Sequence, residues 1–522
     1  MESEVATMLR ARAITALAMA ILSTMAACSA GTGQTGAPAA PAHDAEGGWH
    51  PDWEPPEVPP PAPYPGVTYE NPGVNPPEDP TWDSRSTFGL DVDTGSYTVA
   101  RRYVDDGFLP ERDSVRVEEY VNAFDGGYAP PREGTFAISI DGAPAPFSWG
   151  AWHPADHLVR IGIRARGVDE LERKGASLTF VIDTSGSMDL ENRLELVKRS
   201  LALLVEQLQP TDTVAIVEYG SDARVVLGPT PADDAWAIQE AIAHLVPGGS
   251  TNAAAGLHLG YELARHAFRE GGINRVILAS DGVANVGVTD ADGLLDLIGR
   301  GATDHIQLVT VGFGMGNFND ALMEQLADDG DGFYAYVDDA DEARRLFLED
   351  LSGTLTSVAL DARAQVSFDS EQVSAYRLLG YENRDIADDA FRDDDVAAAA
   401  IGAGQSVTAL YEVELAPGAR GVIGSVQLRW RSPDTGEFDE TGTVISTDAL
   451  APSFDAAAPR FRLAALVAAW AGALRDDPWA ENVSLGLIAE EVLRLQRELR
   501  DDPDVAELAQ LTLETARLTG HR

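Results

Sequence analysis

Residues 177–188 read SLTFVIDTSGSM, an apolar run that leads into the loop Asp183-Thr184-Ser185-Gly186-Ser187. A short, continuous apolar run is typical of a strand that is covered on both faces. Residues 193–208 follow with apolar side chains at helical spacing, and strands then alternate with amphipathic helices as far as residue 352. This alternation predicts a doubly wound α/β domain with a mainly parallel sheet buried on both faces.

The elements expected in this domain follow the same two periodicities, with strands at period two and helices at period 3.6. The strands are residues 177–182, 214–219, 224–227, 275–279, 306–312 and 333–337, and the helices are residues 193–208, 234–245 and 253–268, with three more starting at about residues 292, 320 and 342.

Oxygen-bearing side chains stand where these strands end or these helices begin. Asp183, Ser185 and Ser187 follow the first strand, Thr251 precedes a helix, and Asp281 follows the strand at 275–279. Ligands of such sheets bind at the carboxyl ends of the strands, so these side chains can meet at one rim. Hard oxygen ligands without His or Cys suit Mg²⁺, with Mn²⁺ and Ca²⁺ as alternatives. Two carboxylates leave such an ion open to a carboxylate from outside, which is a binding chemistry.

These five positions, in this order, resemble the von Willebrand factor type A (vWA) domain and its metal-ion-dependent adhesion site. The resemblance covers about residues 176–352. It implies that Ser185, Ser187 and Thr251 bind the ion directly and that Asp183 and Asp281 act largely through water. Two further segments, residues 86–97 and 115–122, look like the N-terminal domain of a family of bacterial vWA lipoproteins, and the residues after Phe461 look like its C-terminal domain.

The N-terminus predicts an export signal. Arg10 and Arg12 precede an apolar run at 13–25, and Cys28 follows it. The run is too short for a membrane-spanning helix, which needs about 20 residues. The end of the segment resembles the lipobox of bacterial lipoproteins, with Cys28 as the lipidated residue and with an outer-membrane destination in the cell envelope. The alternative is an ordinary signal peptide in which Cys28 is incidental.

Composition limits the partners and the chemistry of the 522 residues. The formal charge of −46 and the pI near 4.3 exclude nucleic acid as a partner, because such binding needs a basic footprint. A single Cys excludes intramolecular disulfides, zinc fingers and a Cys-His catalytic pair.

Shifts in composition and periodicity divide the chain into six parts. The N-terminal part after the signal is rich in Pro and reads as a tether, and the flanking segments are expected to pack together. The parts are the signal peptide 1–28, the disordered tether 29–84, an N-terminal α+β domain 85–170, the vWA domain 171–353, a β-rich domain 354–450 and a C-terminal helical region 451–522.

Two enzymatic alternatives are weaker. Asp93-Thr94-Gly95 and Asp434-Thr435-Gly436 each match the loop of an aspartic protease, but the second lies in a polar turn, so Asp91 and Asp93 are interpreted as structural and as possible caps of the helix from Ser96. A serine hydrolase lacks the nucleophile elbow and a convincing His partner, since His258 and His266 are expected to face solvent or neighbouring helices. The expectation is therefore not an enzyme.

The sequence as a whole predicts a lipid-anchored envelope protein whose vWA domain holds a divalent cation and captures a carboxylate of a protein partner. The competing interpretation is a structural scaffold in which a carboxylate of the flanking domains occupies the site.

Overall fold

The computed structural model describes residues 64, 67, 69, 71–147, 157–169, 173–282, 291–314, 320–349, 355–480 and 483–520. Cys28, the predicted signal peptide 1–28 and the predicted tether as far as residue 63 lie outside the described residues. Within the described ranges, no helix combines the length and the apolar character needed to cross a membrane.

A six-stranded sheet forms the centre of the vWA part, in the order β6-β5-β4-β7-β8-β9. All neighbours are parallel except β6, which runs antiparallel to β5 at the edge. This confirms the predicted doubly wound α/β fold. The strands are β4 (Ala176–Asp183), β5 (Thr213–Tyr219), β6 (Ala223–Pro231), β7 (Ile273–Ser280), β8 (Gln307–Phe313) and β9 (Tyr334–Val337).

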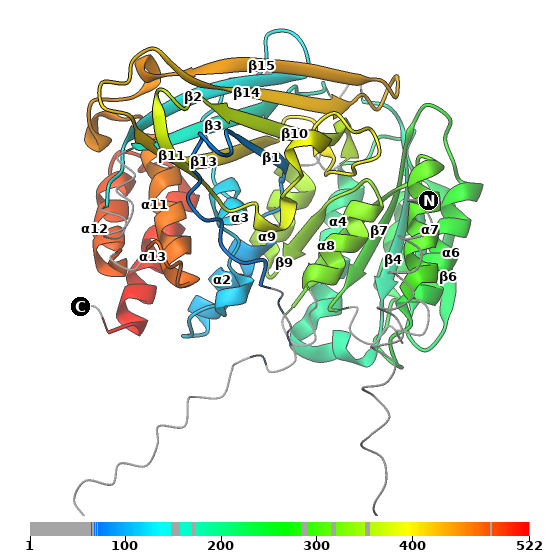
Figure 1. The fold of residues 1–522 in the computed structure, drawn as a ribbon. Helices are drawn as coiled ribbons and strands as arrows, with labels where there is room; N and C mark the ends of the chain where they lie inside the picture. The colour runs from blue at the N-terminus through cyan, green and yellow to red at the C-terminus, as the bar shows by residue number, and fades with distance from the viewer. Residues whose placement is uncertain are drawn as a thin grey trace, which may run out of the picture. The chain divides into compact units, whose positions relative to one another are not determined.

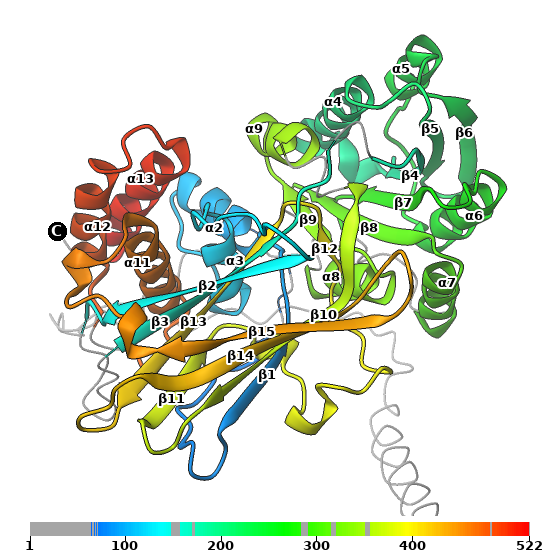
Figure 2. The same cartoon turned by 90° about the horizontal axis from the view of Figure 1, so that it is seen from above.

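Helices cover both faces of this sheet, as Figure 2 shows. One apolar core joins α4, α5 and α9 to the first face, and a second joins α6, α7 and α8 to the other. The strands are therefore buried on both sides, which is why their sequences are almost uniformly apolar. The helices are α4 (Arg193–Glu206), α5 (Ala235–Ala243), α6 (Ala253–His266), α7 (Ala291–Thr303), α8 (Asp320–Asp329) and α9 (Ala340–Arg344).

Two antiparallel sheets pack face to face beside the vWA part and share one apolar core (Figure 1). One sheet has the order β1-β10-β14-β15, with β12 also paired to β10, and the other has the order β11-β13-β3-β2. The strands are β1 (Arg85–Gly89), β2 (Phe136–Pro144), β3 (His157–Ala165), β10 (Ser357–Phe368), β11 (Val373–Leu379), β12 (Ile401–Gly402), β13 (Ser406–Leu415), β14 (Val422–Arg431) and β15 (Phe438–Ser446).

Both sheets mix strands from the two sides of the vWA part in sequence. Strand β1 pairs with β10, and β3 pairs with β13, so the segments 85–170 and 354–450 form a single sandwich. The prediction that the flanking segments pack together is confirmed. The predicted division of these two segments into separate domains does not hold in the structure. The prediction followed the order of the segments in the sequence, because periodicity indicates strands but not their long-range partners.

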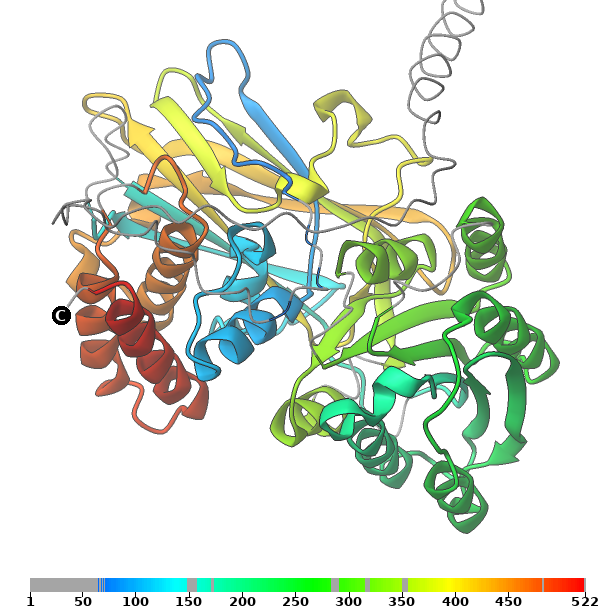
Figure 3. The ribbon, with the colours of Figure 1, turned by 90° about the horizontal axis from the view of Figure 1, so that it is seen from below.

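Helices from the two flanks of the vWA part, the segments before residue 171 and after residue 353, form a third apolar core (Figure 3). Tyr97 of α2 lies against Trp470 of α11, with ring centroids 6.4 Å apart, and Trp470 donates from Nε1 to Thr515 of α13 at 3.0 Å. The helices are α2 (Gly95–Asp105), α3 (Val117–Asn122), α11 (Pro459–Leu474), α12 (Leu485–Gln496) and α13 (Pro503–Leu518). The short helical segments are the π-helix η4 (Arg345–Glu349) and the 3-10 helices η1 (Arg112–Ser114), η2 (Gly186–Asn192), η5 (Glu382–Arg384), η6 (Asp388–Ala390), η7 (Thr447–Ala449) and η8 (Phe454–Ala456).

Residues before β1 already contact the folded part. The rings of Tyr64 and Tyr103 meet edge to face at 5.0 Å, and Glu78 exchanges two backbone hydrogen bonds with Tyr376 of β11, at 2.8 and 3.0 Å. The folded part therefore begins before the predicted tether boundary at residue 84.

Helix α2 also completes the core of the vWA part. Its residues Val99 and Tyr103 are buried in the same cluster as Tyr334 and Tyr336 of β9. Gly95, at the start of α2, lies so close to Tyr334 that a Cβ there would come within 2.6 Å of the ring. The N-terminal flank thus covers the β9 edge of the vWA sheet.

Candidate metal centre

Three loops meet at the carboxyl edge of the vWA sheet. Thr184, directly after β4, donates its backbone N–H to Tyr219 of β5 at 2.8 Å and accepts from Gly248 at 2.7 Å. Gly186 donates to the carbonyl of Gly249 at 3.2 Å. Together these backbone hydrogen bonds hold the loop after β4 against the end of β5 and against the loop before α6.

Hydrogen bonds join four of the five predicted site residues. The backbone N–H of Ser185 donates to Oδ1 of Asp183 at 2.8 Å, and the hydroxyl oxygens of Ser185 and Ser187 lie 3.0 Å apart. Ser187 then donates from Oγ to Oδ1 of Asp281 at 3.0 Å. Side-chain oxygens of Ser187 and Asp281, 94 positions apart in sequence, therefore lie in contact, as the loop pattern predicts.

Thr251 occupies the same loop as Gly248 and Gly249 and is partly buried. The next residue, Asn252, caps α6 by accepting the N–H of Ala255 at 3.1 Å, which fixes where the helix begins. Among the described contacts, no hydrogen bond joins the Thr251 side chain to the other four residues. Its part in the centre remains a prediction.

Burial changes the chemistry of Asp183, whose side chain is inaccessible to solvent. Loss of hydration, opposed by the hydrogen bonds from Ser185 and assisted by the nearby charge of Asp281, raises the pKa of Asp183 to about 6. A divalent cation would reverse this effect, because it stabilises both carboxylates. The donor set, two carboxylates and two hydroxyls, fits a hard cation such as Mg²⁺.

Two residues of this rim were not predicted. Ser280, the last residue of β7, donates its hydroxyl to Oδ2 of Asp183 at 2.9 Å. Arg193, the first residue of α4, pairs through Nη1 with Oδ2 of Asp281 at 2.8 Å. Ser280 stands next to Asp281 in sequence and could have been found there, whereas nothing in the sequence around Arg193 indicates its partner.

A second group of carboxylates lies between the vWA part and its flanks. Oxygens of Asp91, Asp93 and Glu324 all lie within 4.8 Å of one another, and all three residues are buried. Nη2 of Arg384 lies 3.3 Å from Asp93 and 2.7 Å from Glu324. The guanidinium thus offsets part of the negative charge of this group, as buried carboxylates require.

The two protease-like loops have separate surroundings. Asp93 pairs with Arg384, whereas Asp434 pairs with Lys174 at 2.7 Å, and no described contact joins the two aspartates. The expectation that Asp93 caps α2 is wrong, since the N-cap of that helix is Thr94 and Asp93 instead accepts the N–H of Tyr334 at 3.3 Å. The prediction that His258 and His266 face solvent or neighbouring helices is confirmed, because both side chains are exposed.

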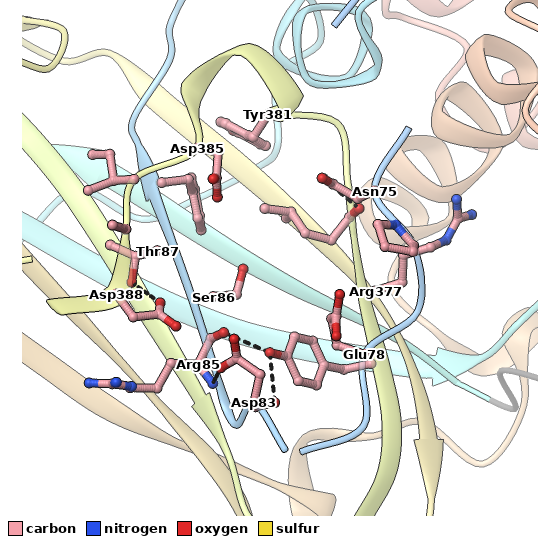
Figure 4. Close-up of a pocket in the computed structure, with 16 residues that line it drawn as sticks. Asn75, Glu78, Asp83, Arg85, Ser86, Thr87, Arg377, Tyr381, Asp385 and Asp388 are labelled. Carbon is pink, nitrogen blue, oxygen red and sulfur yellow. Dashed lines mark hydrogen bonds between the residues drawn. The ribbon is translucent and has the colours of Figure 1, made fainter. Parts of the chain in front are cut away.

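A polar hollow of about 290 Å³ lies elsewhere, between the residues before β1 and strand β11 (Figure 4). Glu78, Asp83 and Asp388 line it, and Asp388 accepts the hydroxyl of Thr87 at 2.6 Å. Burial and the charge of Asp83 raise the pKa of Glu78. None of the five predicted site residues lines this hollow.

Comparison with known proteins agrees with this geometry. The von Willebrand factor type A domain family matches residues 177–352, and the family described as von Willebrand factor matches residues 65–160. The fold and the rim therefore define a vWA-domain protein. The uncharacterized protein YfbK of Escherichia coli (strain K12) is 35% identical over 444 residues, which cover 80% of this chain and 75% of that protein. This chain belongs to the same family as YfbK.

Other similarities are more distant. The uncharacterized protein sll0103 of a Synechocystis strain is 28% identical over 297 residues, 53% of this chain and 67% of that protein. A solved structure, von Willebrand factor type A from Catenulispora acidiphila, covers 70% of this chain and 87% of its own, with 18% identity and a TM-score of 0.41. The family described as the C-terminal part of YfbK matches residues 353–423, in the sandwich, rather than the helices after Phe461 where the resemblance was expected.

Proposed function

We propose that this protein binds a divalent cation, Mg²⁺ in the first place, at the rim formed by Asp183, Ser185, Ser187, Thr251 and Asp281. The observation that carries the proposal is a set of three hydrogen bonds: the backbone N–H of Ser185 to Asp183, the Ser185 hydroxyl with that of Ser187, and Ser187 to Asp281. These contacts support the proposal because two carboxylates and two hydroxyls lie on loops at the same edge of the sheet, which is where such sheets bind ligands. vWA domains often bind a divalent metal at this position and commonly mediate contacts between proteins.

The bound ion then captures a carboxylate of a protein partner. The hydroxyls of Ser185 and Ser187 would supply neutral ligands to such an ion, and Mg²⁺ keeps waters that an outside oxygen can replace. An Asp or Glu side chain of the partner supplies both an oxygen and a negative charge. Mn²⁺ and Ca²⁺ accept the same ligands, so either could replace Mg²⁺.

We also infer that the protein acts in the cell envelope as a binding protein and not as an enzyme. The signal-like N-terminus supports anchoring through a lipid on Cys28, with an outer-membrane destination. The net charge of −46 supports a protein partner over nucleic acid. No step of catalysis is needed to account for the residues at the rim.

Capture of envelope proteins on the immobilised full chain tests this proposal. The same extract is applied to wild type and Asp183→Ala, each in Mg²⁺ and in EDTA, and bound proteins are identified after elution with EDTA. A partner should appear only on wild type in Mg²⁺, and a peptide from its contact region should lose binding when its acidic residue is amidated. Equal capture by both proteins in both buffers would contradict the proposal.

A further inference from the structure

Arg193 shares the Asp281 carboxylate with the rim. Oδ1 of Asp281 accepts from Ser187, while Oδ2 lies 2.8 Å from Nη1 of Arg193. The side chains of Arg193 and Asp281 are only 5% and 3% exposed, so water does little to weaken their attraction. One oxygen thus faces the ligand loop and the other is held by a guanidinium.

The position of Arg193 is unusual for a cation. It is the first residue of α4, where the helix dipole disfavours positive charge. A buried guanidinium also needs a counter-charge, because its desolvation is otherwise unfavourable. Asp281 supplies that charge. Gly314, with φ of +74°, leaves room for the side chain, since a Cβ there would lie 2.5 Å from Nε of Arg193.

A second carboxylate near Arg193 is too distant and too exposed to replace Asp281. Oε2 of Glu191 lies 3.9 Å from Nη2 of Arg193, and its side chain is half exposed. The same oxygen lies 3.8 Å from Nη2 of Arg102, in helix α2. Glu191 therefore divides its charge between two arginines, and of these two described carboxylates Asp281 is the nearer and more buried counter-charge of Arg193.

The formal charges of the rim then decide its chemistry. Asp183 and Asp281 carry two negative charges and Arg193 carries one positive charge, so a bound divalent ion leaves a centre with a net charge of +1. We propose that Arg193 sets the charge of this centre: it weakens the hold on the metal ion alone and makes an external carboxylate the group that completes the loaded site. The inference rests on the proposed function, because it concerns the same site.

Calorimetric titration of the full chain with Mg²⁺, with and without acetate as a carboxylate probe, tests the inference. For wild type, acetate should tighten Mg²⁺ binding, because two ligands that favour each other do so reciprocally. Arg193→Met should bind Mg²⁺ alone roughly tenfold more tightly, the size expected on removal of a nearby unit charge, and should lose most of the acetate effect. Arg193→Lys, which keeps the charge, should behave like wild type.

The control is Arg265→Met, which removes an exposed guanidinium paired with Asp304 at the far end of α6. It should leave both titrations unchanged. Circular dichroism in EDTA establishes that each variant folds. The effect of acetate on Mg²⁺ binding is also measured on the wild-type protein, so this part of the test does not depend on the folding of any variant.

Each outcome decides between the two proposals. Unchanged or weaker Mg²⁺ binding by Arg193→Met, or a wild type indifferent to acetate, would overturn the role of Arg193 while metal binding at the rim stands. Mg²⁺ binding by Asp183→Ala equal to that of wild type would overturn the proposed metal centre, and the role of Arg193 with it. Absence of Mg²⁺ binding in every variant would overturn both.

Discussion

Nη2 of Arg384 lies 2.7 Å from Oε1 of Glu324, and this ion pair joins the turn after β11 to helix α8 of the vWA part. Arg384 also pairs with Asp93 and with Asp328, and Glu324 accepts a second arginine, Arg116, at 3.1 Å. All of these side chains except Asp328 are less than 10% exposed. The vWA part and both flanks thus meet at one buried cluster of charges.

We expect Arg384→Met to lower the free energy of unfolding by about 3–5 kcal/mol, because it leaves buried carboxylates without their cation. Urea unfolding followed by circular dichroism measures this. Arg392→Met is the control, since Arg392 pairs with Glu440 at an exposed position, and it should leave stability almost unchanged. Equal effects of the two substitutions would show that the cluster does not hold the parts together.

Glu118 should make the stability depend on pH. Burial, followed by the charges of Glu382 and Asp91, raises the pKa of Glu118 to about 8. The folded state therefore holds a proton that the unfolded state releases above its ordinary pKa of 4.5. This contribution to stability is complete below pH 4.5 and is lost as pH rises through about 8.

Glu118→Gln keeps the shape of the side chain but cannot ionise, so the variant should lose less stability than wild type between pH 5 and pH 9, by an amount on the order of a few kcal/mol. Urea unfolding across that range provides the comparison. Glu371→Gln, at an exposed position, serves as the control. Parallel pH curves for wild type and Glu118→Gln would mean that Glu118 is ionised in the folded protein throughout.

Two glycines should respond to alanine with opposite signs. Gly95→Ala places a Cβ 2.6 Å from the Tyr334 ring, and the overpacking should destabilise the protein by about 1–3 kcal/mol. Gly299, inside α7, has open space around it, so Gly299→Ala should add up to about 1 kcal/mol through helix propensity. Thermal unfolding distinguishes the two, and a stable Gly95→Ala protein would show that α2 does not pack tightly on β9.

The lipid anchor is tested at Cys28, outside the described residues. Cys28→Ala should move the protein from the membrane fraction to the soluble fraction or leave an uncleaved precursor, because the thiol is the only one available for acylation. Cys28→Ser tests the same point with a closer match in size. Fractionation identical to wild type would rule out lipid attachment there.

Local patterns were sufficient to predict the vWA sheet and the placement of its loops. Residues 177–182 and 275–279 form the central neighbours β4 and β7, and the residues after them meet at the rim as expected. Apolar runs and helical spacing follow from which side chains are buried, so they predict strands and helices even when the packing partners are unknown.

Contacts over long sequence distances were not predictable in the same way. Strand β15 has the sequence FDETGTVIS, too polar to stand out, and its place is fixed by pairing with β14. Strand β11, although mostly buried, lies in a region for which the sequence predicted only a β-rich domain. The ion pair between Arg193 and Asp281 joins two segments that come together only in the folded sheet. Local periodicity carries no information about such a contact.

The metal centre itself is tested most directly by calorimetric titration of Mg²⁺ into wild type and into Asp183→Ala. Asp183 supplies one of the two formal negative charges among the five proposed ligands, so its loss leaves a single carboxylate, itself paired with Arg193, to oppose the hydration of the ion. We expect one binding event in wild type, none in Asp183→Ala, and the same circular dichroism spectrum for both. Ser185→Ala should weaken binding less, since water can replace one neutral oxygen. Binding of Mg²⁺ by Asp183→Ala with the affinity of wild type would contradict the account.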